Sequence, residues 1–268
     1  MRIIDPHIHC VSRITDDYEK MALAGIEAVI EPAFWLGEPR TTVGAFIDYF
    51  SMICGWERQR AAQYGIQHFC TMAMNPREAN NVKLAKQVFP VVEQYLDRDG
   101  VVAIGEIGFD RQTKEEEQAI RIQLRMAKKR DLPVLIHLPH QFKKIGTERT
   151  LKVVKEEKME PELVLLDHNT EETLPLYAGT KYWRGITCYP VTKMSVDRTA
   201  NCVQQYGVER LLINSAADWG PSDPVSVPRC VIELQKRGVA TEQIEKLVWH
   251  NPQKFFGQSG QFKLKQKA

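Results

Sequence analysis

Four histidines and two carboxylates of this chain have the types and positions expected of ligands for divalent metal ions. Asp5, His7 and His9 form an Asp-x-His-x-His pattern close to the N-terminus. In an extended stretch, side chains two residues apart share a face, so one metal ion can bind both imidazoles. The other candidates follow apolar runs later in the chain and are Glu106, His137, His168 and Asp218. Neutral imidazoles bind zinc, iron and nickel, and carboxylates balance the charge of such ions.

The candidate ligands outnumber those that one catalytic metal ion requires, since such an ion usually takes three ligands from the protein. Four imidazoles and two carboxylates therefore predict a pair of divalent ions, which lie about 3.5–4 Å apart in two-metal enzymes. Glu106 has two oxygens and can bridge such a pair. Zinc is the first candidate, and the ligand types also accept manganese, iron, nickel or magnesium.

Each of these residues has a simpler explanation when it is considered alone. Histidine does many jobs besides binding metal, and a lone Asp218 after a strand would more often be a helix N-cap. The six residues taken together are stronger evidence for a metal site than any one of them alone. Five of the seven histidines occupy these positions or, as with His140, lie beside one. We therefore interpret the six residues together as one metal site.

Short apolar runs precede these residues and alternate with longer amphipathic segments. Such alternation is typical of a parallel sheet whose strands are connected by helices. The predicted strands are residues 2–6, 27–33, 67–73, 101–107, 133–138, 163–167, 183–188 and 210–214. Runs such as Val-Val-Ala-Ile and Leu-Val-Leu-Leu are apolar throughout, as expected for strands that are covered on both faces.

Helices are predicted between the strands from apolar residues at helical spacing. They span residues 16–24, 42–64, 115–129, 149–157, 196–206, 225–237 and 241–248, with Thr241 as the N-cap of the last. Eight strands alternating with helices predict a (β/α)8 TIM barrel that occupies residues 1–268 as a single domain. A doubly wound open sheet, which usually has fewer strands, is the main alternative. In a barrel the carboxyl ends of all strands form one rim, where the six candidate ligands would meet.

Several segments resemble the TatD family of metal-dependent hydrolases, within the amidohydrolase-like barrels. They are Asp5-Pro6-His7-Ile8-His9, GEIGFD at residues 105–110, Ile136-His137, Asp167-His168, Asp218 and NPQKFFG at residues 251–257. The resemblance implies that His7, His9 and Asp218 hold one metal ion, that His137 and His168 hold the second, and that Glu106 bridges them. The stretches EPAFWLGEPRT and NSAADWG are similar to the TatD-like proteins of Ebo-type gene clusters.

Two departures from the nuclease-like members of this family bear on the substrate. Those members usually carry Glu-Thr-Asp around the last ligand, where this chain has Ala216-Ala217-Asp218. They also tend to have an arginine two residues after the fifth-strand histidine, where this chain has Pro139. A basic group there would help to hold a phosphate. Arg111 can take its place as a phosphate contact, although an ordinary surface arginine is an equal alternative.

Further candidates for substrate binding follow the predicted strand ends. They are Trp35, His140, Tyr189 and Trp219, for which ordinary loop packing is an equal alternative. Asp218 is also the predicted catalytic residue, because as a general base it would take a proton from a metal-activated water and pass it to the leaving group. Asp110 is interpreted as a rim-loop residue, a partner of a ligand histidine or a helix cap, and His68 and His250 as structural residues.

The composition is that of an ordinary globular domain, with 43% hydrophobic and 26% charged residues. A net charge of +2 does not support nucleic-acid binding through bulk charge. The one concentrated basic stretch is a tail with Lys263, Lys265 and Lys267. No apolar run approaches the roughly 18 residues of a membrane span. Six scattered cysteines and the absence of a signal-peptide pattern predict reduced thiols and a cytoplasmic location.

These observations leave three functions open. The first is a binuclear metal-dependent hydrolase that uses a metal-activated water on a phosphoester, amide or lactone of a small molecule. The second is a TatD-type metal-dependent deoxyribonuclease, with nucleic acid as its partner. The third is a non-catalytic barrel that binds a metabolite or a partner in a biosynthetic or export pathway, although six metal ligands argue against it. A sugar-isomerase barrel is a weaker alternative, because no lysine can be assigned to such a site. The sequence predicts no oligomeric state.

Overall fold

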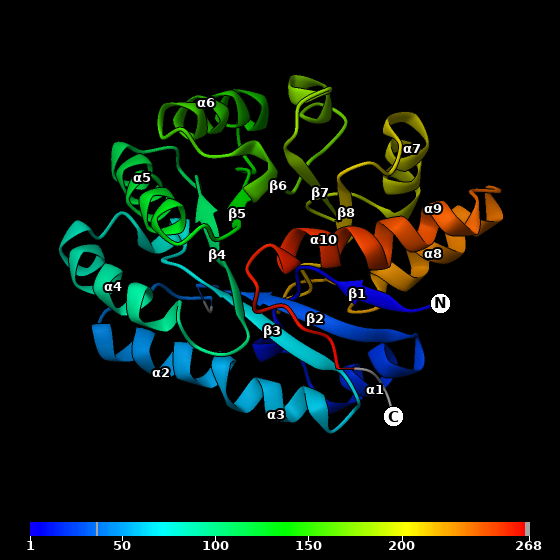
Figure 1. Cartoon of the computed structure of the whole chain (residues 1–268), viewed down its shortest axis with the longest axis horizontal. Coiled ribbons are helices and arrows are strands. Elements are labelled where there is room, and N and C mark those ends of the chain that lie inside the picture. Colours follow the sequence, from blue (N-terminus) through cyan, green and yellow to red (C-terminus); the bar gives the residue numbers. More distant parts are fainter. Residues whose placement is uncertain (36, 266–268) are drawn as a thin grey trace.

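Eight parallel strands form the centre of the computed structural model, which describes residues 1–35 and 37–265 (Figure 1). The strands are β1 (Ile3–Asp5), β2 (Ile26–Pro32), β3 (Gln67–Met72), β4 (Val101–Gly108), β5 (Val134–His137), β6 (Val164–Asp167), β7 (Trp183–Thr187) and β8 (Leu211–Asn214). Each predicted strand is therefore present and shifted by no more than one residue at either end. Leu36 of the EPAFWLGEPRT stretch and Lys267 of the predicted basic tail lie outside the described residues.

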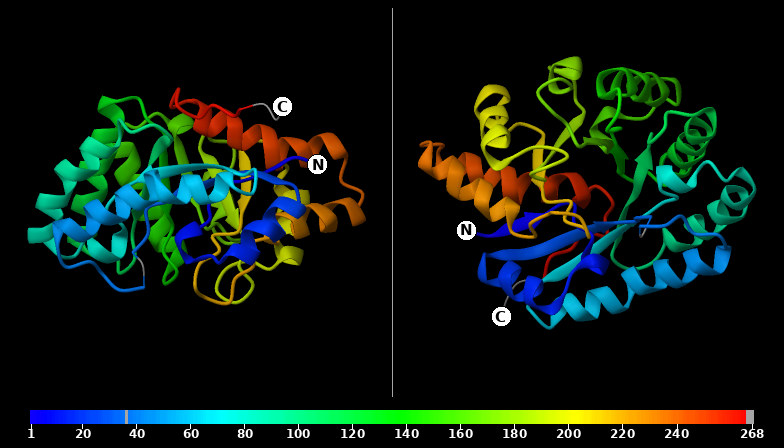
Figure 2. Two further views of the ribbon diagram at one scale, coloured as in Figure 1. Left: turned by 90° about the horizontal axis from the view of Figure 1, so that it is seen from below. Right: turned by 180° about the vertical axis from the view of Figure 1, so that it is seen from behind.

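The strands pair in sequence order from β1 to β8, and every neighbouring pair is parallel. Contacts just beyond the strand ends bring β8 back to β1. The amide of Ala216 donates to the carbonyl of His7 at 2.7 Å, and that of His9 donates to the carbonyl of Ala217 at 3.0 Å. The helices surround the strands on the outside, as the view from behind shows (Figure 2). The predicted TIM barrel is confirmed.

The helices differ from the prediction more than the strands do. They are α1 (Thr15–Leu23), α2 (Val43–Cys54), α3 (Trp56–Ala62), α4 (Val82–Tyr95), α5 (Lys114–Lys129), α6 (Lys143–Glu156), α7 (Val196–Tyr206), α8 (Ser226–Lys236), α9 (Thr241–Glu245) and α10 (Asn251–Gly257). The stretch 42–64, predicted as one helix, is interrupted at Gly55. Helix α6 begins six residues before the predicted start at Arg149. Helix α4, which contains Pro90, has no counterpart in the prediction.

The last predicted helix, residues 241–248, begins at the expected place with different capping. Ala240 is the N-cap of α9, and Thr241 is its first helical residue, so the predicted capping role of Thr241 is wrong. The chain then continues through a π-helical turn (Lys246–His250) into α10. Pro252 occupies the first turn of α10.

Two layers of apolar side chains hold the barrel together. The interior layer contains alternate strand residues such as Ala28 and Ile30 of β2, which pack with Phe255 and Phe256 of α10. The intervening residue Val29 points the other way, into the layer between strands and helices. This alternation follows from the two-residue period of a strand. Polar side chains occupy the carboxyl ends of the strands. Helix α10 covers the opposite end of the barrel (Figure 1).

Among the described residues no helix is both long and apolar enough to cross a membrane. All six cysteines are free thiols, and five of them are buried. His68 is buried as well, and its Nε2 lies 2.7 Å from Oε2 of Glu31 in the layer behind the barrel wall. Cys10 lies close to both, and a structural role for His68 stays a prediction.

Candidate metal centre

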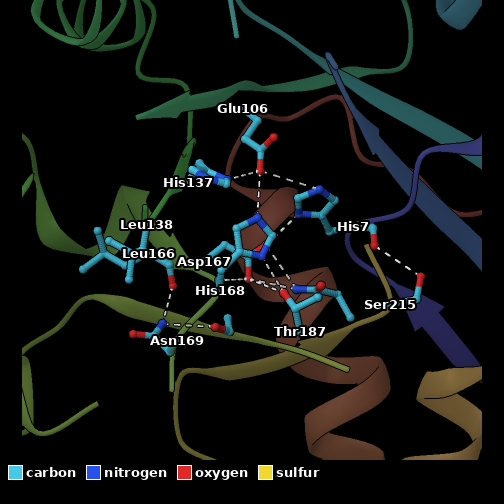
Figure 3. Close-up of polar contacts among 12 residues, drawn as sticks. His7, Glu106, His137, Leu138, Leu166, Asp167, His168, Asn169, Thr187 and Ser215 are labelled. Atoms are coloured by element: carbon cyan, nitrogen blue, oxygen red, sulfur yellow. Dashed lines mark hydrogen bonds and ion pairs between the residues drawn. The ribbon is translucent and has the colours of Figure 1, made fainter. Parts of the chain in front are cut away.

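Glu106 lies at the carboxyl-terminal end of β4 and is surrounded by histidines from three other strand ends (Figure 3). Its Oε1 is 2.9 Å from Nε2 of His168, 3.0 Å from Nδ1 of His137 and 3.8 Å from Nε2 of His7. His7, Glu106 and His168 are buried, and their ligand-capable atoms all lie within 4.8 Å of one another. The barrel therefore brings together four of the six predicted ligands, with three histidines around one oxygen of Glu106.

His9 joins this group through His7. The two Nε2 atoms are 3.2 Å apart, and the two rings are nearly perpendicular at 89°. Two nitrogens bound to one tetrahedral metal ion at about 2.0–2.1 Å lie about 3.3 Å apart. The spacing of His7 and His9 is therefore that of two ligands of one ion. The ring of His9 stacks on Phe34, with 3.8 Å between the ring centroids, which holds the plane of the imidazole.

The charge states of these side chains favour a divalent cation. Burial lowers the pKa of His9 and that of His168 well below the ordinary value, so both are neutral and keep a lone pair. Burial opposes ionisation of Glu106, but His137 and His168 together hold its pKa well below the ordinary value. Neutral imidazoles with an ionised carboxylate are the donors that zinc and related metals prefer. The residues present thus fit the metal ions that the sequence predicts.

The backbone of β4 is adapted to present Glu106. Its register with β5 shifts between Ile104 and Ile107, and such irregularities re-aim side chains beside active sites. Gly105 lies in this stretch. A Cβ atom at Gly105 would lie 2.8 Å from Cβ of Leu135 and 2.9 Å from its carbonyl oxygen, so the close approach of β4 and β5 requires glycine. The glycine of the GEIGFD motif therefore has a direct packing role next to the ligand.

Asp167 of β6 orients the ligand histidines from behind. Its Oδ2 accepts from Nδ1 of His7 at 2.6 Å, which leaves Nε2 of His7 directed to the centre. The amide group of Asn214 donates to both oxygens of Asp167, at 2.9 and 3.1 Å. Nδ1 of His168 lies 2.7 Å from Oγ1 of Thr187, so its Nε2 also faces the centre. Partners of this kind select the tautomer of a metal-binding histidine.

Gly185 of β7 makes room for this carboxylate. A Cβ atom at Gly185 would collide with Oδ1 of Asp167. The position of Asp167 thus depends on a residue without a side chain on the neighbouring strand.

Asp218 lies in the same cavity but apart from the close group of ligands. Within the described residues no histidine nitrogen lies within 4.0 Å of its carboxylate. Its Oδ1 accepts from the hydroxyl of Tyr189 at 2.7 Å and from the amide of Gly220 at 2.8 Å. A Cβ atom at Gly220 would collide with the Tyr189 hydroxyl, so glycine is needed for this contact. The structure therefore places Asp218 at the rim, held by two donors.

A cavity of about 120 Å³ opens above the centre. It is lined by His9, Phe34, Trp35, Asn75, Pro76, Arg77, Glu106, Asp110, His137, His140, His168, Lys193 and Asp218. Trp35 and His140 are thus at the positions predicted for substrate contacts. Tyr189 is buried and contacts the cavity through Asp218, while Trp219 stacks on Phe34 with 5.8 Å between centroids and is 52% exposed.

Arg111 is exposed and is not among the residues that line this cavity. Its backbone amide donates to the carboxylate of Glu116, 3.1 Å away, in the loop before α5. The neighbouring Asp110 does line the cavity and lies 3.4 Å from Nε of Arg77. A phosphate contact by Arg111 stays a prediction, and the cations that face the cavity are Arg77 and Lys193.

Sequence reasoning missed five of the lining residues, namely Phe34, Asn75, Pro76, Arg77 and Lys193. Asn75 follows the end of β3 closely and donates to Oε2 of Glu106 at 3.2 Å, so its position after a strand was a usable signal. Lys193 lies six residues beyond the end of β7, where only the course of the loop brings it back to the rim.

Comparison with known proteins agrees with this geometry. A family model described as TatD related DNase matches residues 4–257. A metal-dependent hydrolase of Methanocaldococcus jannaschii is 29% identical over 256 residues, which cover 95% of this chain and 99% of that protein. The crystal structure of a TatD-like protein from Archaeoglobus fulgidus has a TM-score of 0.77 at 26% identity, covering 94% of this chain and 99% of the other. A lactonase from Listeria monocytogenes shares the fold, with a TM-score of 0.67 at 13% identity over 95% and 94% of the two chains.

The family match extends from β1 to the end of α10 and includes every element that carries a candidate ligand. The family and the relative from Methanocaldococcus jannaschii are described as hydrolases, and the latter as metal-dependent. A centre built of imidazoles and a carboxylate agrees with that chemistry. This chain belongs to the TatD-related DNase family and is a metal-dependent hydrolase of the TatD type.

Proposed function

We propose that this hydrolase uses two divalent metal ions, with zinc as the first candidate, to cleave a phosphoester, amide or lactone of a small molecule. The arrangement around Glu106 supports this proposal most strongly. One of its oxygens lies within 3.0 Å of nitrogens from both His137 and His168. On another side, Nε2 of His7 approaches the same oxygen and Nε2 of His9. Two pairs of imidazoles that share one carboxylate suit two ions better than one.

In this proposal His7 and His9 would hold one ion, His137 and His168 would hold the other, and the carboxylate of Glu106 would be available to both. Asp218 would complete the ligand set of the first ion from the rim. Bound divalent ions lower the pKa of water toward neutrality and polarise the oxygen of the bond to be cleaved. The protein itself supplies orientation, because Asp167 and Thr187 fix the tautomers of His7 and His168.

Asp218 is the proposed proton acceptor. Its carboxylate lines the cavity, and Tyr189 and Gly220 hold Oδ1, so the carboxylate has a defined orientation toward a bound substrate. A carboxylate in this position can take a proton from the nucleophile and return it to the leaving group. Phe34 and Trp35 border the cavity and exclude water from one side of it.

The dimensions of the cavity favour a small substrate over a nucleic acid. A volume of about 120 Å³ with aromatic walls accommodates one compact group at a time. Deoxyribonuclease activity is the second candidate, because the matching family is described as DNase-related. The free thiols of all six cysteines support a reducing compartment, and we propose the cytoplasm.

The two candidates are separated by assaying the zinc-loaded and manganese-loaded protein on two sets of substrates. The first set contains small esters, amides, lactones and phosphoesters, and the second is single-stranded DNA labelled at the 5′ end. Turnover of a small molecule that is abolished by Glu106→Gln supports the proposal. Trimming of the DNA 3′ end, without turnover of any small molecule, would establish the nuclease instead.

A further inference from the structure

Lys193 is a cation fixed at the rim of the candidate metal centre, in the loop that follows β7. The loop closes on itself, because the amide of Tyr189 donates to the carbonyl of Met194 at 2.9 Å and that of Lys193 to the carbonyl of Tyr189 at 3.1 Å. Met194 is fully buried and forms a bridge with Cys188 at the end of β7. The backbone of Lys193 is therefore anchored, and its side chain lines the cavity beside Glu106.

The ammonium group of Lys193 has no ion-pair partner in the described part of the chain, where no carboxylate oxygen lies within 4.0 Å of its Nζ. Its recorded neighbour is the ring of Tyr189, whose centroid is 5.1 Å from Nζ. The other cation of the cavity is balanced, since Nε of Arg77 lies 3.4 Å from Asp110 and its guanidinium stacks on Trp35 at 4.2 Å. Among the described residues that line this cavity, Lys193 is therefore the cation without an ion pair.

An unbalanced ammonium beside a centre for divalent cations is costly unless something negative binds there. Half-burial removes part of the water that would stabilise the charge, and burial lowers the pKa of Lys193 against the opposing effect of Glu106, Asp167 and Asp218. Two divalent ions would add more positive charge than these three carboxylates remove. A cavity with this excess attracts anions and disfavours cations and neutral groups.

We propose that Lys193 binds an anionic group of the substrate, a carboxylate or a phosphate, next to the bond that the metal centre cleaves. The inference rests on the proposed hydrolase function and specifies its substrate class as anionic small molecules. Lysine serves such a role as a point charge that contacts carboxylate or phosphate oxygens. Its hydrogen bonds to a charged group are each worth roughly a ten- to hundredfold change in affinity.

The first experiment measures catalysis on a matched pair of substrates with the zinc-loaded protein. The pair is 4-nitrophenyl butyrate and the monoester of 4-nitrophenol with glutaric acid, which differ by one carboxylate, and 4-nitrophenyl phosphate provides the phosphate arm. We expect Lys193→Met to lower kcat/KM about ten- to hundredfold more for the anionic substrates than for the neutral ester, mainly through KM. Lys193→Arg should restore most of the loss.

A second readout does not depend on turnover. Binding of inorganic phosphate and of acetate to the zinc-loaded protein is measured by calorimetry at low salt for the native chain and for Lys193→Met. The control is Lys152→Met, which removes an exposed lysine of α6 with 75% of its side chain accessible. Anion binding should weaken in Lys193→Met and persist in Lys152→Met, and the stronger of the two anions identifies the preferred group.

The proposal is overturned if Lys193→Met binds both anions as tightly as the native chain. It is equally overturned if its loss of kcat/KM is the same for the neutral and anionic esters. A protein that hydrolyses none of the three substrates but loses anion binding in Lys193→Met would contradict the proposed hydrolase specificity while supporting the role of Lys193. The failures of the two proposals are thus distinguishable.

Discussion

Nδ1 of His7 lies 2.6 Å from Oδ2 of Asp167, although the two residues are 160 positions apart in the chain. This contact joins the end of β1 to the end of β6 across the rim. It also decides which nitrogen of His7 faces Glu106, because the carboxylate accepts the Nδ1 proton and leaves Nε2 free. The buried Asp167 thus prepares a ligand without lining the cavity itself.

Asp167→Asn should therefore weaken metal binding without removing any proposed ligand. An amide at this position is a poorer acceptor and can present its NH2 group to His7, which favours the wrong tautomer. We expect the affinity for zinc to fall about 10- to 100-fold. Competition with a chromophoric chelator measures the affinity, and circular dichroism confirms that the variant is folded. An unchanged zinc affinity in the folded variant would show that Asp167 does not orient the ligand.

Gly185→Ala tests the space that this carboxylate requires. A methyl group would collide with Oδ1 of Asp167, so either the carboxylate or β7 must move. We expect a loss of about 1–3 kcal/mol in the free energy of unfolding, measured in urea, together with weaker zinc binding. The matched control is Gly257→Ala at the end of α10, where an added Cβ meets nothing within 4 Å. The control should be neutral or slightly stabilising, and a neutral result for Gly185→Ala would refute the steric argument.

The strands and the ligand histidines are predictable from sequence for a physical reason. A strand covered on both faces requires a continuous apolar run such as Leu163–Leu166, and a polar residue directly after it must lie at the rim. Lys193 follows no such rule, because a six-residue excursion of the loop after β7 returns it to the cavity. Helix α4 is obscured by Pro90, which lacks the amide hydrogen of a regular helix.

The surroundings of Asp218 show a different limit of sequence reasoning. Its place after β8 predicts a rim position correctly. Its carboxylate is held there by the hydroxyl of Tyr189 and the amide of Gly220, which both lie in loops. Hydrogen bonds between loops leave no periodic pattern in the sequence. The sequence therefore does not predict how far Asp218 lies from Glu106 and the histidines.

Asp218→Asn should separate catalysis from metal binding. If Asp218 is the proton acceptor, the variant keeps its fold and most of its metal but loses about 10²- to 10⁴-fold in kcat. Tyr189→Phe, which removes only one hydrogen bond to Oδ1, should lose much less. Both are measured with the zinc-loaded protein on the best substrate of the panel, with the zinc content of each variant determined in parallel. Full activity of Asp218→Asn would show that another group accepts the proton.

Stability at alkaline pH should report on the buried thiol of Cys202 in α7, away from the metal centre. Burial raises its pKa from the ordinary value of 9.0 to about 11. Between these pH values the unfolded chain has lost a proton that the folded chain retains, so stability falls as pH rises. Relative to Cys202→Ala, the native chain should lose about 1–2 kcal/mol of unfolding free energy between pH 8 and pH 10.5. Urea titrations of both proteins across this range test the difference, and parallel curves would contradict it.

The most direct test of the metal centre is the number of zinc ions that remain bound per chain after dialysis, measured by elemental analysis of the native protein and of Glu106→Gln. Glutamine has nearly the shape of glutamate but lacks its charge and cannot bridge two cations as a carboxylate does. We predict two zinc ions in the native protein and one or none in the variant, with both proteins folded. A native protein that retains no zinc, or a variant that retains both ions with unchanged affinity, would contradict the assignment of Glu106 as the residue shared by two metal ions.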